Sequence, residues 1–325
     1  MTPSQQLLQD LNVDVPLICG AMYPCSNPEL VAAVSEAGAM GVVQPMSLSF
    51  VHGYEFREGL RFIRSLTKKP IGLNLILETS SKTYRERTEQ WASVAAEEGV
   101  KFFVTALGNP SWVVELAQQH GITVYHDVTN TQPAQKALDA GVDGFIAVNA
   151  NAGGHAGTLS PEQLLEAIAP MGKPIVAAGG IGNANDFKNA LTLGYAGTQL
   201  GTRFIATHEC SAHQDYKAAI VAAQSEDIVL TERLTGVPVA IINTPYIQKI
   251  GTKAGPLARW MLKGRKTKHW MRTIYSLQSV WKLKKANLQG SAYQDYWQAG
   301  KSAGSVVAIE SAADIVRQFA QDQSW

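Results

Sequence analysis

Short apolar segments alternate with longer amphipathic segments along the first 200 residues of the chain. The apolar segments are rich in β-branched residues and uniformly hydrophobic, which predicts strands that are buried on both faces. They lie at residues 15–20, 41–46, 70–77, 101–106, 122–127, 143–148, 174–178 and 196–200. The intervening segments have the spacing of amphipathic helices, and we expect helices at 28–37, 54–67, 83–98, 110–120, 131–140, 161–169 and 184–193.

The alternation of strands and helices predicts an α/β fold with a parallel sheet, because parallel strands need crossover connections between them. Eight such units favour a closed (β/α)8 TIM barrel. An open Rossmann-type sheet is the main alternative, and it requires a GxGxxG turn after the first strand. The residues found there run Gly20-Ala21-Met22-Tyr23-Pro24 and lack that fingerprint.

The chain changes character after the eighth strand. Residues 249–285 contain 11 Lys or Arg, no Asp or Glu, and three Trp. We therefore expect a barrel at 1–248, a basic helical insertion or subdomain at 249–292, and a segment at 293–325 that returns to the barrel and contains a closing helix at 307–320. The insertion is interpreted as a solvated helical excursion that its tryptophans pack onto the barrel, as a basic mouth that attracts anionic ligands, or as a surface that binds nucleic acid or a membrane.

Composition and charge exclude several classes of protein. The 325 residues are 46% hydrophobic, enough for a large core, and a net charge of +1 gives no reason to expect a nucleic-acid partner. Three cysteines, Cys19, Cys25 and Cys210, cannot build a disulfide framework. The polar N-terminus lacks the pattern of a signal peptide, and no apolar run is long enough to span a membrane. We expect a cytoplasmic protein, and a homo-oligomer is compatible with the sequence.

Three glycine-rich clusters follow predicted strands six, seven and eight. They are Asn151-Ala152-Gly153-Gly154-His155-Ala156-Gly157, Gly179-Gly180-Ile181-Gly182 and Gly201-Thr202-Arg203. In a TIM barrel the carboxyl ends of the strands carry the functional site, and the loops after strands seven and eight bind phosphate. Glycine lets backbone N–H groups approach an anion closely, so the clusters predict a phosphate-bearing ligand. The alternative is that these glycines only make tight turns.

His155 is the candidate catalytic residue, because it follows a barrel strand and is flanked by small residues. An imidazole exchanges protons near neutral pH, and no second ligand at metal spacing accompanies it, so we expect no metal site. An amide inside strand three, Asn74, is expected to face a planar heterocycle or to bond a neighbouring strand.

Three further strands carry polar candidates of the same kind. Gln44 and Gln199 resemble Asn74 in lying within apolar strands, on strands two and eight. His126 and Asp127 end strand five, and they either contact the ligand or cap the following loop.

Five motifs together resemble the nitronate monooxygenase family, also called 2-nitropropane dioxygenases. The motifs are PLICGAM near the start, GLNL on strand three, AGGHAG after strand six, PIVAAGGIG on strand seven and GTQLGTRF on strand eight. The resemblance covers residues 10–245 and resumes near 296–317. The same scaffold is shared with enoyl-ACP reductase II and with NADH:quinone reductases.

The resemblance implies FMN as the resident cofactor and His155 as the catalytic residue. The isoalloxazine ring is expected against Gly20, Ala21 and Met22, with Asn74 at its polar edge and Gly154 beside it. The phosphate is expected at Gly179, Gly180, Gly201 and Thr202, with Gln199 nearby.

The implied activity is oxidation of alkyl nitronates, and by extension nitroalkanes, with O2. An NAD(P)H-dependent reductase acting on an enoyl thioester or a quinone is the alternative. A flavin- or phosphate-binding protein without turnover is a third hypothesis, in which the basic surface docks a partner.

Overall fold

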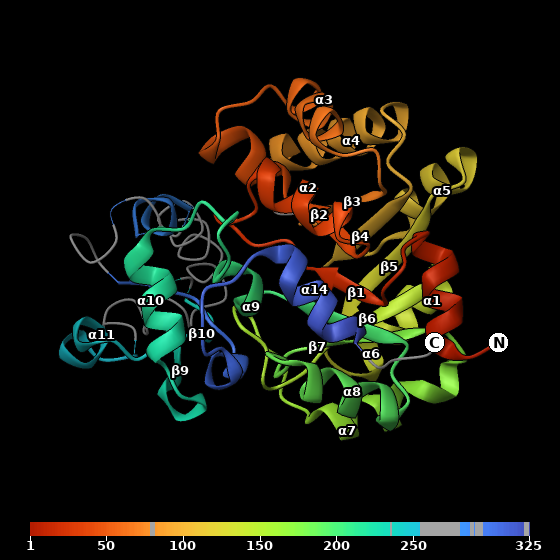
Figure 1. Ribbon diagram of the computed structural model, residues 1–325. Coiled ribbons are helices and arrows are strands. Elements are labelled where there is room, and N and C mark those ends of the chain that lie inside the picture. Colours follow the sequence, from red (N-terminus) through yellow and green to blue (C-terminus); the bar gives the residue numbers. More distant parts are fainter. Residues whose placement is uncertain (79–81, 235, 254–279, 287–288, 290–294, 322–324) are drawn as a thin grey trace.

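Eight parallel strands form a closed barrel in the computed structural model of the chain (Figure 1). They are β1 (Leu17–Cys19), β2 (Met40–Val43), β3 (Ile71–Ile76), β4 (Phe102–Ala106), β5 (Thr123–Val128), β6 (Gly144–Val148), β7 (Ile175–Ala178) and β8 (Gly197–Leu200). Each strand pairs with its sequence neighbours, and β8 closes the ring by pairing with β1. The structure describes residues 1–78, 82–234, 236–253, 280–286, 289, 295–321 and 325. The predicted (β/α)8 barrel is confirmed, with every strand inside its predicted range or within one residue of it.

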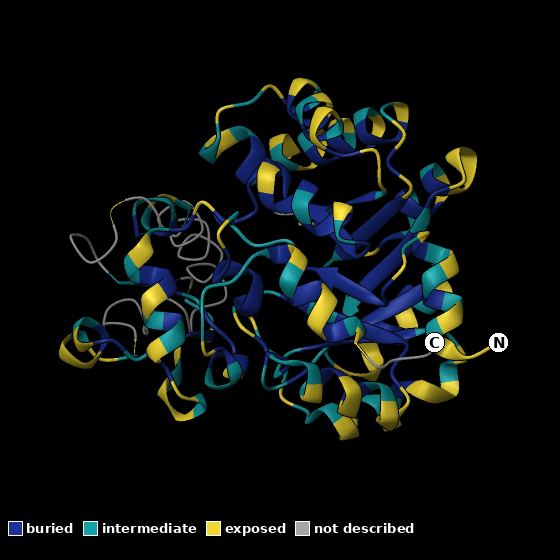
Figure 2. Ribbon diagram, viewed as in Figure 1, coloured by how far each residue is buried: buried dark blue, intermediate teal, exposed yellow. Residues whose placement is uncertain are grey.

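Helices surround the barrel and separate its strands. They are α2 (Pro28–Glu36), α3 (Phe56–Leu66), α4 (Lys82–Glu97), α5 (Ser111–His120), α6 (Thr131–Asp139), α7 (Pro161–Ile168) and α8 (Ala184–Leu193). A π-helical turn, η1 (Ser47–Val51), and a 3-10 turn, η2 (Ala169–Met171), complete this layer. Figure 2 shows buried residues along the strands and the inner faces of the helices, and exposed residues on the outer faces. This burial is the two-sided pattern from which the strands were predicted.

A helix that the sequence did not predict, α1 (Pro3–Leu11), closes the amino-terminal end of the barrel. Thr2 caps it, and Leu7 and Leu11 pack among the residues that fill the barrel interior. Tyr125 crosses that interior, and its hydroxyl donates a 2.7 Å hydrogen bond to the carboxylate of Asp10 on α1. Side chains therefore fill the barrel at its amino-terminal end, and its carboxyl-terminal end remains for a ligand.

After β8 the chain forms a short helix, α9 (Thr202–Ile205), and then a small lobe beside the barrel mouth (Figure 1). The lobe contains α10 (Gln214–Ala222), a 3-10 turn η3 (Ser225–Asp227), an antiparallel pair β9 (Ile228–Thr231) and β10 (Val239–Ile242), and α11 (Pro245–Ile250). Its own small core consists of Leu234, Val239, Ile241, Ile247, Leu283 and Tyr296. The two strands were not predicted.

Most of the predicted basic insertion at 249–292 lies outside the described residues. Its described part includes the end of α11 and the helical residues 280–286. The chain then returns to the barrel through η5 (Lys301–Ser305) and α14 (Ala312–Ala320). The predicted closing helix at 307–320 starts too early, because Ser311 caps α14 by accepting a hydrogen bond from the Asp314 amide.

Candidate active site

The predicted site residues lie within or directly after five of the eight strands. Gly20, Ala21 and Met22 follow β1, Asn74 is in β3, Gly154 and His155 follow β6, Gly179 and Gly180 follow β7, and Gln199, Gly201 and Thr202 end or follow β8. Because the strands are parallel and the barrel is closed, these ends meet at one mouth.

The loop after β6 carries His155, and the small lobe holds this loop in place. The Gly154 carbonyl accepts a 2.8 Å hydrogen bond from the amide of Ala240 on β10. Gly154 has a φ angle of 66°, in the left-handed region that glycine adopts readily. His155 is exposed to solvent in the structure, yet desolvation by the surrounding loop lowers the pKa of its imidazole below the ordinary value. The ring is therefore neutral at neutral pH, with one N–H donor and one lone pair.

The turns after β7 and β8 offer backbone N–H groups at the same mouth. Gly179 and Gly180 have φ angles of 116° and 83°. A Cβ atom on Gly179 would lie 2.5 Å from the Ala152 nitrogen, so a larger residue does not fit there. Within the described part of the chain, the amides of Gly180, Gly201 and Thr202 donate to no protein acceptor. Such a group of amides forms an anion-binding concavity, and these donors fit a phosphate.

Asn149, which the sequence analysis missed, ties two of the glycine clusters together. Its side chain is fully buried at the end of β6. The amide nitrogen donates to the Gly179 carbonyl at 3.0 Å, and the amide oxygen accepts from the Asn151 amide at 2.8 Å. The sequence did contain a signal for Asn149, because it is a polar residue directly after an apolar strand.

The C-terminal segment closes over the same turns. The Gly300 amide donates to the Thr202 hydroxyl at 2.9 Å, and the Lys301 amide donates to the Asn151 carbonyl at 2.9 Å. Below them the buried Arg203 guanidinium forms an ion pair with Glu310. The Thr202 hydroxyl oxygen already accepts a hydrogen bond, so its own hydrogen remains available to a ligand.

The loop after β1 and the strand β3 provide the remaining predicted contacts. A Cβ atom on Gly201 would lie 3.5 Å from the Met22 sulfur, which places the β1 and β8 loops side by side. A Cβ atom on Gly20 would meet the Gln199 side chain at 2.9 Å. The Asn74 side chain makes no hydrogen bond to the described part of the chain, and its contact with a planar heterocycle remains a prediction.

The sequence left open whether Gln44, His126 and Asp127 contact the ligand. The side chains of the first two form hydrogen bonds to other protein groups. The Gln44 side chain accepts the Ser47 amide at 2.7 Å and starts η1. His126 faces away from the barrel interior, where its Nδ1 lies 2.8 Å from the Thr105 hydroxyl. Burial lowers the pKa of His126 to about 4, so its imidazole is neutral under ordinary conditions. Asp127, the third candidate, faces inward.

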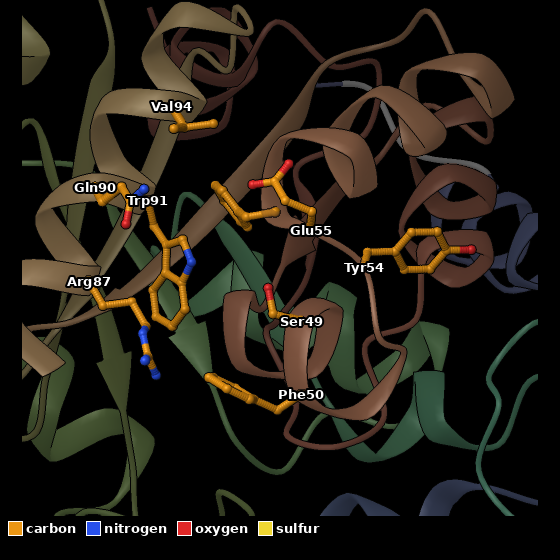
Figure 3. Close-up of a pocket in the computed structure, with 9 residues that line it drawn as sticks. Ser49, Phe50, Tyr54, Glu55, Arg87, Gln90, Trp91 and Val94 are labelled. Carbon is orange, nitrogen blue, oxygen red and sulfur yellow. The ribbon is translucent and has the colours of Figure 1, made fainter. Parts of the chain in front are cut away.

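A surface pocket of about 260 Å³ lies apart from this mouth, between η1, α3 and α4 (Figure 3). Its lining residues include Phe50, Tyr54, Glu55, Arg87 and Trp91, and none of the predicted site residues lines it. Figure 3 shows Arg87, Trp91 and Phe50 gathered on one side of the pocket. The pocket belongs to the outer wall of the barrel, so the candidate active site remains the mouth with its glycine turns.

Two structural absences concern the described residues alone. No group of three or more His, Cys, Asp or Glu side chains there is arranged to hold a metal ion. No helix in the same part of the chain is long and apolar enough to cross a membrane.

A (β/α)8 barrel with phosphate-type turns and a histidine at its mouth is typical of barrel enzymes that bind phosphate-bearing ligands. The chain belongs to the nitronate monooxygenase family, whose family model matches residues 5–322. The family resemblance drawn from the sequence motifs is therefore confirmed.

Proteins similar to this chain differ in their named activities. A probable nitronate monooxygenase of Staphylococcus saprophyticus is 28% identical over 74% of this chain and 79% of its own. The (3aS,4S,5R,7aS)-5-hydroxy-7a-methyl-1-oxo-octahydro-1H-indene-4-carboxyl-CoA dehydrogenase of Rhodococcus jostii is 22% identical, over 97% of this chain and 94% of its own. Among solved structures, FabK from Thermotoga maritima has a TM-score of 0.79 and 27% identity, covering 97% of this chain and 94% of that one.

Proposed function

We propose that the protein is an FMN-dependent oxidoreductase that oxidises alkyl nitronates with O2. The observation that carries this proposal is the neutral imidazole of His155 at the same mouth as the phosphate-type turns. Gly179, Gly180, Gly201 and Thr202 would hold the FMN phosphate. Bound FMN supplies the electron acceptor for the oxidation and the partner for O2.

The remaining contacts would orient the flavin ring. Gly20, Ala21 and Met22 would lie against the ring, because the β1 loop adjoins the phosphate turn at Gly201. Asn74 would offer both a donor and an acceptor to the polar edge of the ring. Gly154 would lie beside it, and Gln199 would support the β1 loop from below.

His155 would bind and position the substrate. An alkyl nitronate carries its negative charge on two nitro oxygens, and the N–H of a neutral imidazole can donate to one of them. The lone pair on the other ring nitrogen can accept the α-proton of a nitroalkane, which extends the activity to the neutral substrate. Gly154 and Ala156 flank the imidazole with minimal bulk and leave room for a small aliphatic chain.

Anaerobic mixing of the purified protein with propionate-3-nitronate tests this function. We expect a change of the flavin absorbance spectrum within the turnover time, followed by reoxidation when O2 is admitted. In His155→Gln the rate with the nitronate should fall by about 10-fold or more, because the hydrogen bond from the imidazole N–H is displaced and a hydrogen bond to a charged group contributes about 1.5–3 kcal/mol. His120→Gln, an exposed histidine on α5, is the matched control and should leave the rate unchanged. A wild-type spectrum unaltered by the nitronate refutes the proposal.

A specific observation favours a second candidate, an NAD(P)H-dependent oxidoreductase of an acyl thioester. The helical residues 280–286 carry Lys282, Lys284 and Lys285, and they contact the loops after β1 and β2. Lys284 donates to the Phe50 carbonyl at 2.6 Å. A positive surface at the mouth suits an anionic dinucleotide or acyl-CoA, and the relative that spans nearly the whole chain is named for a carboxyl-CoA substrate.

Stopped-flow mixing with NADH and with NADPH separates the two candidates. Fast loss of the oxidised flavin spectrum, with a rate that falls as ionic strength rises, supports the second candidate. Lys284→Ala should weaken the dinucleotide's apparent affinity, whereas Lys82→Ala, an exposed lysine on α4, should not. Slow or absent reduction of the flavin by both nucleotides excludes the NAD(P)H-dependent candidate and leaves the nitronate activity.

A further inference from the structure

The side chain of Asp127 points into the barrel at its mouth. Successive residues of a strand face opposite sides, and Tyr125, two residues earlier on β5, belongs to the barrel interior. Val124 and Val128 pack instead in the outer core between the barrel and its helices. Asp127 therefore shares the face of Tyr125, one step closer to the carboxyl end of β5. That step places the carboxyl group at the end of the barrel where the glycine turns lie.

The carboxyl group is surrounded by apolar side chains. Asp127 pairs in register with Ile146 on β6, and Val148 lies one inward position further along the same strand. On the other side, Val104 of β4 pairs with Tyr125 and belongs to the barrel interior, so Ala106, two residues further along, shares its face. The residue as a whole is partly accessible, but its Oδ1 atom is enclosed and has no hydrogen-bond partner in the described part of the chain. A buried carboxyl oxygen without a partner is costly, so its partner is expected from outside the protein.

The loop that carries His155 returns over the end of β5. The Gly157 amide donates to the Asn149 carbonyl at 3.2 Å, and a Cβ atom on Gly157 would lie 2.3 Å from the Val148 oxygen and 3.5 Å from Thr129 Cβ. Thr129 directly follows β5. Asp127 and His155 therefore border the same mouth from adjacent elements.

The other titratable groups near Asp127 are engaged elsewhere. His126 faces the outer core and pairs with the Thr105 hydroxyl. The Tyr125 hydroxyl lies at the opposite end of the barrel, bonded to Asp10. The inward positions of β4 and β6 beside Asp127 carry no titratable side chain. Among the described elements that pack around Asp127, His155 is then the remaining titratable group.

We propose that Asp127 is a second acid–base residue of the mouth, which hydrogen-bonds and exchanges a proton with an N–H, O–H or carbonyl group of the bound ligand. The proposal rests on the proposed flavin site, and the ligand atom belongs either to the flavin or to the organic substrate. When the ligand atom takes the proton, the carboxylate that remains is reprotonated from water, and no electrons move.

The pKa values of the two residues support a division of roles. Desolvation raises the pKa of Asp127 to about 7, whereas it lowers the pKa of His155. Environments that shift the pKa values of two titratable groups in opposite directions are typical of acid–base pairs. Near neutral pH, Asp127 retains a proton to donate while the His155 imidazole is uncharged.

The experiment follows the Asp127 carboxyl directly, by carbon-13 NMR of full-length protein labelled at its aspartate carboxyl carbons. The signal is assigned by its loss in Asp127→Asn, with Asp139→Asn on the exposed face of α6 as the control that removes a different signal. Titrations are recorded for the protein alone, with FMN, and with FMN plus propionate-3-nitronate. FMN binding is measured separately by quenching of its fluorescence.

We expect a midpoint near neutral pH for the protein alone, and a midpoint displaced by at least about half a pH unit when the contacting ligand is present. Displacement by FMN assigns the contact to the flavin, and displacement only after the nitronate is added assigns it to the substrate. FMN that binds while the midpoint stays in place under both conditions overturns this inference and leaves the proposed function standing. FMN that fails to bind overturns both.

Discussion

The stability of the protein should decline as pH rises through the range where Asp127 remains protonated only in the folded state. Burial raises the pKa of this carboxyl from 3.8 to about 7. Between these values the unfolded chain has lost the proton and the folded chain still holds it. Folding stability falls with rising pH wherever the folded state binds more protons. The loss of folding stability caused by Asp127 therefore begins above about pH 4 and is complete above about pH 7.

The size of this effect follows from the pKa difference. Each pKa unit corresponds to about 1.4 kcal/mol, so a difference of about three units gives roughly 4 kcal/mol as an upper bound. Asp127 is partly accessible, and only its Oδ1 atom is enclosed. Water that reaches the other oxygen reduces the cost of ionisation, which makes about 2–4 kcal/mol the expected range. Asp127→Asn removes this pH dependence because an amide does not ionise.

Urea unfolding of wild type and Asp127→Asn at a series of pH values measures the effect as a difference curve. The free energy of unfolding of the variant, minus that of wild type, should rise by about 2–4 kcal/mol between pH 4 and 7 and then stay level. Contributions from other titrating groups, including His126, are common to both proteins and cancel. Asp139→Asn should give a flat curve. A flat curve for Asp127→Asn as well would refute the placement of an enclosed, unpartnered carboxyl at this position.

Three further predictions concern the glycine turns and the outer core. Gly180→Val should strip the flavin, since Gly180 has a φ of 83° and its Cβ would lie 3.0 Å from Asn151 Cβ; the absorbance of the purified variant checks this. Gly172→Val is the control, because its φ of 69° is equally strained but no atom lies within 4 Å. Asn149→Ala leaves the buried groups it satisfied without partners, so flavin affinity, measured by fluorescence quenching, should fall about tenfold. As pH falls from 6.5 to 4, His126 should cost the wild type about 3 kcal/mol of unfolding free energy, measured by urea unfolding. His126→Gln should lack this pH dependence. That stability is present above the unfolded pKa and lost as pH falls, the opposite sign to Asp127.

The barrel strands were predictable because their composition and their environment agree. A strand buried on both faces is apolar at every position, and such runs appear in the sequence with little interruption. The predicted strand at 70–77 and the observed Ile71–Ile76 illustrate the agreement. Only β5, observed as Thr123–Val128, extends one residue beyond its predicted end.

The elements that the sequence analysis missed have weaker local signals. The helix α1 buries only Leu7 and Leu11, so its sequence looks polar as a whole. The strands β9 and β10 form an isolated two-stranded ribbon, and β9 is mostly accessible. The start of α14 was readable, because Ser311 and Asp314 have the spacing of an N-cap, but the apolar residues before Ser311 extended the predicted helix.

The candidate site was predictable where glycine and histidine mark a turn, and unpredictable where the outcome depends on register. In a strand that is apolar on both faces, the pattern alone does not say which alternate residues face the interior. His126 and Asp127 were therefore left open together, although the structure turns them to opposite sides. Gln44 likewise bonds its own loop at Ser47, a local competition that composition does not reveal.

The mouth depends on chain segments far apart in sequence, and this dependence explains why the family match extends beyond the barrel. The β6 loop is held by Ala240 from the lobe, and the β8 turn is held by Gly300 from the C-terminal segment. Arg203, directly after the β8 turn, is neutralised by Glu310. The lobe and the returning segment therefore fix the glycine turns from outside the barrel strands. The helical residues 280–286 contact the loops after β1 and β2 through Tyr23 and Phe50, so their proposed effect on anionic substrates would act from that side of the mouth.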